Sequence, residues 1–145
     1  MVYTELTKKA VNIAYKAHEG QIDKSGIPYI FHPMHLADQM TTEDTCVVAI
    51  LHDVLEDTDV TYEELSKEGF TKEQLEALKL LTHSSDVPYL DYVRNLKDNP
   101  IARTVKLADL KHNQDKTRLN VITKKDEKRL IKYKKAENIL LGIEE

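Results

Sequence analysis

In the segment CVVAILHDVLEDT, residues 46–58, an apolar run is followed directly by a cluster of charged residues. Its first six residues are apolar nearly all round a helix, which is typical of a helix at the centre of a globular core. Thr41 or Thr42 precedes the run and is suited to capping the start of such a helix. The segment therefore predicts a buried central helix around which the other elements pack.

The charged end of this segment carries His52, Asp53, Glu56 and Asp57. On a continuous helix, residues four apart lie above one another, so His52 should pair with Glu56 and Asp53 with Asp57. Carboxylates this close repel each other, and burial makes each ionised group costlier. A divalent cation would offset these charges and would be bound by their oxygens. The alternative is an exposed helix end with solvated acids, where the helix dipole disfavours negative charge.

Further ligands for such a cation must come from other parts of the chain. His32 lies at the exit of a loop and precedes Pro33, which favours an extended backbone at His32. Asp109 borders the apolar stripe of a later helix. A mixed set of imidazole and carboxylate ligands without thiolate favours Mn²⁺, Fe²⁺ or Mg²⁺ over a structural zinc. The sequence thus predicts a metal site built from three distant segments.

Helical periodicity dominates the remainder of the chain, and no alternating run is long enough for a strand. Capping boxes at Thr61 with Glu64 and at Thr71 with Gln74 mark two further helix starts. We expect an all-α fold in one domain covering residues 1–145. The expected helices cover approximately residues 6–17, 34–40, 46–57, 63–68, 73–81, 89–97, 101–117 and 124–141.

Composition limits the classes of function. With 32% charged and 41% hydrophobic residues and a net charge of −4, the chain is typical of a soluble globular protein and not of a dedicated nucleic-acid binder. The single cysteine, Cys46, suits a reducing compartment. No leader or membrane-spanning pattern is visible, so we expect a cytoplasmic protein without a membrane partner. We interpret the late cluster of basic residues as a solvated helix face: Lys124, Lys125, Lys128, Arg129, Lys132, Lys134 and Lys135.

The helix around Asp109 carries polar groups on the same face. Lys106 precedes it by three positions, and His112 and Asn113 follow it by three and four. This face is suited to holding a phosphate group, with Lys106 neutralising its charge. We interpret the other histidines as structural or exposed, with His35 the first exception to consider: His18, His35, His83 and His112.

Several separated motifs resemble one known family. In chain order they are AYKAHEGQ, DKSGIPYIFHP, VVAILHDVLEDTDVT, LKLLTH and VKLADLKHN. Together they resemble the HD-domain phosphohydrolases, and within them the hydrolase domain of the RelA/SpoT alarmone enzymes and the stand-alone small alarmone hydrolases. The resemblance covers approximately residues 14–118 and implies a single helical HD domain.

The resemblance also implies an activity and a site. It implies hydrolysis of ppGpp, guanosine 3′,5′-bis(diphosphate), at the 3′ pyrophosphate, with one Mn²⁺ ion as cofactor and Fe²⁺, Mg²⁺ or Zn²⁺ as alternatives. The implied metal ligands are His32, His52, Asp53 and Asp109. The implied catalytic pair, which orders or activates the attacking water, is Glu56 and Asp57. The implied substrate contacts are Lys24, Ser25 and Asn113, with Tyr29 close by.

Two departures from the family pattern bear on substrate recognition. The chain reads Asp23-Lys24 where the alarmone hydrolases usually have Arg-Lys, whose arginine lies against the guanine ring. It also reads Leu110-Lys111 where many relatives have Arg-Leu. An acid cannot replace a stacking guanidinium. We therefore keep two alternatives to ppGpp hydrolysis: a phosphatase acting on another nucleotide, such as the 2′-phosphate of NADPH, and a nucleotide sensor with little turnover. A homo-oligomeric state is left open.

Overall fold

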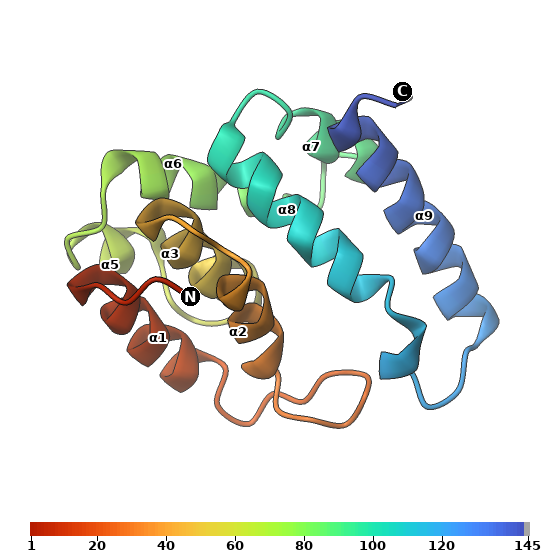
Figure 1. Ribbon diagram of the computed structural model, residues 1–145, viewed down its shortest axis with the longest axis horizontal. Coiled ribbons are helices and arrows are strands. Elements are labelled where there is room, and N and C mark those ends of the chain that lie inside the picture. The colour runs from red at the N-terminus through yellow and green to blue at the C-terminus, as the bar shows by residue number, and fades with distance from the viewer. Residues whose placement is uncertain (144–145) are drawn as a thin grey trace.

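A computed structural model describes residues 1–143, and these fold as a bundle of helices (Figure 1). Within this range the β pairing is limited to an isolated bridge between Ile22 and Pro28, which confirms the all-α prediction. The helices are α1 (Glu5–Ala17), α2 (Phe31–Asp38), α3 (Glu43–Leu51), α4 (Val54–Asp57), α5 (Tyr62–Ser66), α6 (Lys72–Leu81), α7 (Tyr89–Arg94), α8 (Pro100–Asn113) and α9 (Lys124–Leu141).

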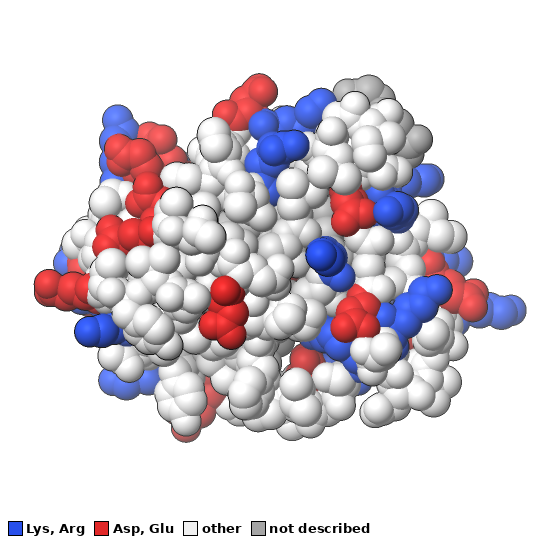
Figure 2. Space-filling model, in the orientation of Figure 1, with Lys and Arg blue, Asp and Glu red and all other residues white. Residues whose placement is uncertain are grey.

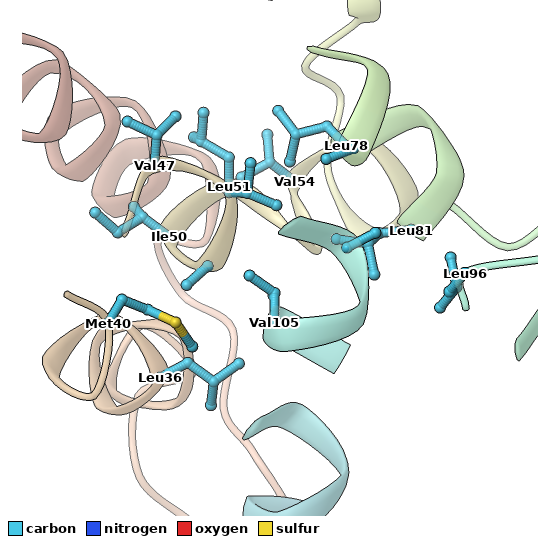
Figure 3. Packing of buried hydrophobic residues seen from close by; sticks show 14 of the residues in the cluster. Leu36, Met40, Val47, Ile50, Leu51, Val54, Leu78, Leu81, Leu96 and Val105 are labelled. Atoms are coloured by element: carbon cyan, nitrogen blue, oxygen red, sulfur yellow. The ribbon is translucent and has the colours of Figure 1, made fainter. Parts of the chain in front are cut away.

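Helix α3 lies at the centre of the bundle and packs against α1, α2, α6 and α8 (Figure 1). Every residue from Cys46 to Leu51 has an exposed fraction of 0%. Their side chains meet Leu36 of α2, Leu78 of α6 and Val105 of α8 (Figure 3). Full burial of a Leu, Ile or Val side chain contributes about 1.5–3 kcal/mol, so this helix supplies a large part of the stabilisation of the fold.

The helix starts follow the capping signals in the sequence. Thr42 accepts a hydrogen bond from the Thr45 amide at 3.1 Å and caps α3. The two predicted capping boxes open α5 and α6. Gly142 ends α9 in a left-handed conformation with φ of 73°, which glycine adopts without strain.

The helix predicted over residues 46–57 is interrupted, which corrects the sequence interpretation. α3 ends at Leu51 and α4 begins at Val54, so His52 and Asp53 lie in the turn between them. His52 Nδ1 lies 2.7 Å from the carbonyl oxygen of Ala49, the acceptor that the amide of residue 53 would use in a continuous helix. The directions of the His52 and Asp53 side chains are therefore set by a turn. The pairing with Glu56 and Asp57 that was expected from one continuous helix does not apply.

Among the other boundaries that differ from the prediction, two concern residues near the site. α2 begins at Phe31, so His32 is helical and not extended; Pro33 is tolerated because the first turn of a helix needs no amide donor there. α8 ends at Asn113, and a 3₁₀ turn over Lys116–Arg118 replaces the predicted continuation of the helix. The second change places Arg118 beside the loop that precedes α2.

The surface of the described residues carries mixed charge. Blue and red atoms alternate over α8 and α9 on the face shown in Figure 2. On α9, Arg129 pairs with Asp126 at 3.3 Å and Lys134 with Glu137 at 3.0 Å. Among residues 1–143, no helix combines the length and the apolarity that crossing a bilayer requires.

Candidate metal centre and adjoining pocket

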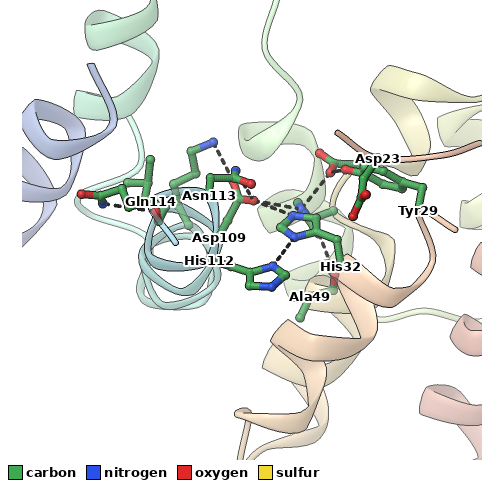
Figure 4. Close-up of polar contacts among 12 residues, drawn as sticks. Asp23, Tyr29, His32, Ala49, Asp109, His112, Asn113 and Gln114 are labelled. Atoms are coloured by element: carbon green, nitrogen blue, oxygen red, sulfur yellow. Dashed lines mark hydrogen bonds and ion pairs between the residues drawn. The ribbon is translucent and has the colours of Figure 1, made fainter. Parts of the chain in front are cut away.

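Three buried side chains from distant segments of the chain meet beneath the end of α3. They are His32 from α2, His52 after α3 and Asp109 from α8, and their candidate ligand atoms all lie within 4.8 Å of one another. His32 Nε2 is 2.8 Å and His52 Nε2 is 3.6 Å from Asp109 Oδ1. Figure 4 shows Asp109 and His112 extending from α8 toward His32. Two imidazoles and a carboxylate in this arrangement are suited to holding a divalent cation.

The atoms of His52 fit such a cation. Its Nδ1–H donates to the Ala49 carbonyl at 2.7 Å, which leaves the lone pair on the buried Nε2. Nε2 has no hydrogen-bond partner of acceptable geometry among the described residues, although Asp53 Oδ2 is 3.0 Å away. Burial lowers the pKa of His52, but the Asp53 and Asp109 carboxylates outweigh burial and raise this pKa well above its usual value. The two carboxylates therefore favour a positive charge at His52 Nε2. A bound cation would supply that charge in place of the proton.

Asp53 lies at the edge of this group. Its Oδ2 accepts a hydrogen bond from the Tyr29 hydroxyl, so Tyr29 fixes the direction of the carboxylate. Burial raises the pKa of Asp53, and the neighbouring His52 more than reverses that effect and lowers the pKa to about 2. Asp53 is therefore ionised and adjacent to the three converging side chains, and its role as a fourth ligand remains a prediction.

Replacement of Tyr29 by phenylalanine tests whether the Tyr29 hydroxyl orients the Asp53 carboxylate. We expect Tyr29→Phe to weaken Mn²⁺ binding by about 10–100-fold, because partners that orient a metal ligand typically contribute that much. The dissociation constant would be measured by titration calorimetry on protein stripped of metal. Tyr15→Phe, at an exposed tyrosine of α1, is the matched control and should leave the constant unchanged. Equal affinities for Tyr29→Phe and the control would contradict the claim that Tyr29 orients Asp53 for metal binding.

His112 supports His32 from behind. The Nδ1 atoms of the two rings are 2.7 Å apart, so one ring donates and the other accepts. Burial and the nearby Arg118 lower the pKa of His112 to about 4, which keeps it neutral and able to accept the Nδ1–H of His32. That arrangement directs the lone pair of His32 Nε2 toward Asp109. The sequence analysis interpreted His112 as structural or exposed and placed it on the face of Asp109, but it did not predict the contact with His32.

Lys106 and Asn113 contact Asp109 directly. Lys106 Nζ is 3.0 Å from Asp109 Oδ2, and it lies 5.6 and 5.4 Å from the ring centroids of Tyr89 and Tyr92. Asn113 Nδ2 donates to Asp109 Oδ1 at 3.1 Å. Burial alone would raise the pKa of Asp109, but Lys106 and His32 hold it well below its usual value. Both residues thus orient the aspartate; their predicted contacts with substrate remain predictions.

The two predicted catalytic carboxylates differ in their surroundings. Glu56 Oε1 accepts a hydrogen bond from the His83 amide at 2.7 Å, which ties α4 to the segment after α6. Both side chains are exposed at the surface. Loss of hydration on the covered side of Asp57 and the like charges of Asp53 and Glu56 raise the pKa of Asp57 to about 6. A carboxylate with a pKa in this range is suited to general-base catalysis near neutral pH, and the catalytic roles of Glu56 and Asp57 remain predictions.

The raised pKa of Asp57 predicts an effect on stability. Ionisation opposes folding when the folded pKa lies above the ordinary 3.8, so the penalty is present above about pH 6 and absent below about pH 4. We expect metal-free Asp57→Asn to melt at a higher temperature than metal-free wild type at about pH 7, with the difference vanishing near pH 4. Thermal unfolding in EDTA measures this, and Asp59→Asn is the control. A difference in melting temperature that grows toward pH 4 would contradict the raised pKa of Asp57.

The remaining predicted residues line a pocket beside the triad. The pocket has a volume of about 290 Å³ and lies between the loop that precedes α2, the end of α8 and α9. Its walls include four residues predicted to contact substrate, namely Lys24, Ser25, Tyr29 and Asn113. Because Tyr29 bonds Asp53 and Asn113 bonds Asp109, the pocket adjoins the candidate metal centre. A nucleotide in this pocket would have its reacting group near the triad.

Known proteins share both the sequence and the fold. No protein-family model matches the chain. The chain is 35% identical over 141 residues to a guanosine-3′,5′-bis(diphosphate) 3′-pyrophosphohydrolase of Borreliella burgdorferi, covering 86% of the chain and 20% of that protein. It is 32% identical over 121 residues to the bifunctional (p)ppGpp synthase/hydrolase SpoT of Escherichia coli, covering 73% of the chain and 17% of that protein. The chain therefore spans about a fifth of the length of these curated relatives.

A solved metazoan orthologue of SpoT, described as hydrolysing ppGpp, superposes with a TM-score of 0.74 at 21% identity, covering 99% of this chain and 94% of that one. The chain is thus similar in sequence to RelA/SpoT enzymes and in fold to this SpoT orthologue. The structural likeness extends over almost the whole length of both chains, so the chain has the fold that the sequence motifs implied. The RelA/SpoT resemblance stated from those motifs is thereby confirmed.

Proposed function

We propose that this chain is a metal-dependent hydrolase that releases pyrophosphate from the 3′ position of ppGpp, and that residues 1–145 form one HD domain. The observation that carries the proposal is the convergence of buried His32, His52 and Asp109 beside a pocket of about 290 Å³. The names of the relatives support the same reaction, since several of them are 3′-pyrophosphohydrolases. We further propose a cytoplasmic location, which suits the free buried Cys46.

The proposed reaction is a hydrolysis. Water attacks the phosphorus attached to the ribose 3′ oxygen, the bond between that oxygen and phosphorus breaks, and the products are pyrophosphate and guanosine 5′-diphosphate. A divalent cation, when bound, would lower the pKa of a water and polarise a phosphoryl oxygen. We propose His32, His52, Asp53 and Asp109 as its ligands and Mn²⁺ as the ion, with Fe²⁺, Mg²⁺ and Zn²⁺ as alternatives.

The chain's own groups supply the remaining steps. Asp57, with its raised pKa, would accept the proton of the attacking water. Glu56 is held by the His83 amide and would position Asp57 and the water through α4. Lys24, which is 55% exposed at the mouth of the pocket, would neutralise phosphate charge. Tyr29 and Asn113 would border the ribose, because both join the pocket to the candidate metal centre.

A second candidate function is a phosphatase acting on another nucleotide, such as the 2′-phosphate of NADPH. Asp23 favours it, because this acid stands where the alarmone hydrolases usually carry the arginine that lies against guanine. Phosphate ester hydrolysis needs the same cation and base, so the triad fits both reactions. The two candidates differ in the product that leaves the site.

Product analysis tests the proposal. Protein loaded with Mn²⁺ would be incubated with ppGpp, NADPH and GTP, and pyrophosphate and orthophosphate would be quantified. We expect pyrophosphate from ppGpp and no product in EDTA. Orthophosphate from NADPH without pyrophosphate from ppGpp would replace the proposal by the second candidate. Nucleotide binding without any product would support the third candidate, a sensor.

A further inference from the structure

An ion pair that the sequence does not reveal closes one side of the pocket. Arg118 Nη2 lies 3.3 Å from Asp23 Oδ2, although the two residues are 95 positions apart. The side chain of Asp23 is only 6% exposed and that of Arg118 is 21% exposed. Asp23 Oδ1 also accepts hydrogen bonds from the amide and hydroxyl of Ser25 at 2.8 and 2.6 Å. The loop thus fixes Asp23, and Asp23 fixes the guanidinium of Arg118.

Further bonds connect Arg118 to the candidate metal centre. Its Nη1 donates to the His112 carbonyl at 3.1 Å and to Asn113 Oδ1 at 3.3 Å. Asn113 Nδ2 in turn donates to Asp109 Oδ1 at 3.1 Å. A network of hydrogen bonds therefore runs from Asp23 through Arg118 and Asn113 to Asp109. These bonds fix the position of Arg118 relative to the candidate metal centre.

These bonds determine what Arg118 can offer a ligand. Three of its five N–H groups already donate within the chain, and Asp23 balances its charge. A phosphate would gain little from such a group, whereas stacking on an aromatic ring uses the planar face of a guanidinium and needs none of these N–H groups. Apolar side chains line the same pocket, among them Ile22, Leu119 and Leu130. A planar guanidinium among aliphatic side chains is an environment for a nucleobase.

Phosphate groups find better partners on another wall of the pocket. Lys24 and Arg129 both approach a single carboxylate, Asp126, at 3.7 and 3.3 Å. Asp126 can balance only one of these two cations, so this side of the pocket is better suited to a phosphate than Arg118 is. A nucleotide bound in this way would have its phosphate and its base against different walls.

We propose that Arg118 is a specificity-determining residue that stacks on the base of the bound nucleotide, and that Asp23 is the positioning residue that holds it in place. The inference rests on the proposed function, because it assigns the pocket to the base of the nucleotide that this reaction would cleave. The acid at position 23, which argued against base recognition in the sequence, here orients an arginine supplied by the turn after α8.

Two phosphate probes, one with a base and one without, test the proposal. Guanosine 5′-monophosphate and ribose 5-phosphate would be titrated into Mn²⁺-loaded protein by calorimetry. We expect Arg118→Lys to weaken binding of the nucleotide about tenfold and binding of the sugar phosphate less than about twofold, because lysine keeps the charge and loses the planar face. Asp23→Asn, which keeps an acceptor for Ser25, should weaken only the nucleotide. The double variant should lose no more than Arg118→Lys alone, because both changes act on one contact.

Arg129→Lys is the matched control, since it makes the same change at another residue of the same pocket. The Arg129→Lys protein should prefer the nucleotide over the sugar phosphate by the same factor as wild type. Equal losses for both probes in Arg118→Lys would make Arg118 a phosphate contact and overturn the proposal. So would unchanged binding in that variant, a loss of preference in Arg129→Lys, or no preference in wild type. Hydrolysis of ppGpp is measured separately, so a protein without turnover but with an Arg118-dependent preference would refute the proposed function alone.

Discussion

Replacement of Asp109 by asparagine is expected to abolish metal binding and hydrolysis together. The carboxylate lies 2.8 Å from His32 Nε2 and 3.6 Å from His52 Nε2, so its negative charge is what allows a cation to bind between two neutral imidazoles. A bound metal supplies several kcal/mol of transition-state stabilisation, so we expect turnover to fall by on the order of 10³-fold or more. Metal content by mass spectrometry and ppGpp turnover would be measured on the same preparations.

The design of this experiment must account for Lys106. Its Nζ bonds Asp109 at 3.0 Å, and a buried cation that loses its partner destabilises a fold by about 3–5 kcal/mol. The double variant Asp109→Asn with Lys106→Met removes that unpaired charge and should be folded and metal-free. Asp44→Asn is the matched control, because Asp44 accepts a hydrogen bond from Gln74 at 2.8 Å and lies outside the triad. Retention of about one metal ion per chain in a folded Asp109 variant would contradict the ligand assignment.

Replacement of Asp57 by asparagine is expected to separate metal binding from catalysis. We expect kcat to fall by about 10²–10⁴-fold, the usual contribution of a general base, while metal content stays as in wild type. The rate of the wild-type protein should rise with pH as Asp57 ionises, and the residual rate of the variant should lack this rise. A variant that retains full activity would remove Asp57 from the mechanism.

Glu56 provides the comparison for Asp57. Because Glu56 Oε1 accepts from the His83 amide at 2.7 Å, Glu56→Gln keeps an acceptor for this bond and should lose less activity than Asp57→Asn. Glu56→Ala also removes the bond and should lose more than Glu56→Gln, again with metal retained. The reverse order, with Glu56→Gln more damaging than Asp57→Asn, would identify Glu56 as the base.

The parts of the fold that local sequence determines were predictable. The apolar run Cys46 to Leu51 fixed the central helix, because residues that are apolar all round can only be buried. The capping boxes at Thr61 and Thr71 fixed two helix starts through hydrogen bonds that span three residues. The sequence predicted that His32 and Asp109 would lie near His52, because the acidic cluster after the apolar run needed a cation and two ligands cannot hold one firmly.

The parts that depend on tertiary contacts were not predictable from one sequence. The break at His52 involves a side chain bonding the Ala49 carbonyl, which helical periodicity does not register. The ion pair of Asp23 with Arg118 joins segments 95 residues apart. Without that pair, the sequence suggested only that an acid had replaced a stacking arginine, and it gave no reason to look at Arg118.

The proposed metal site is tested most directly by a crystal structure of the protein grown with Mn²⁺, with anomalous diffraction recorded at the manganese edge. We expect a single anomalous peak within coordination distance of His32 Nε2, His52 Nε2 and an Asp109 oxygen, with the Asp53 carboxylate as the fourth protein ligand. A manganese peak elsewhere in the molecule, or no peak among these side chains, would contradict the proposed site.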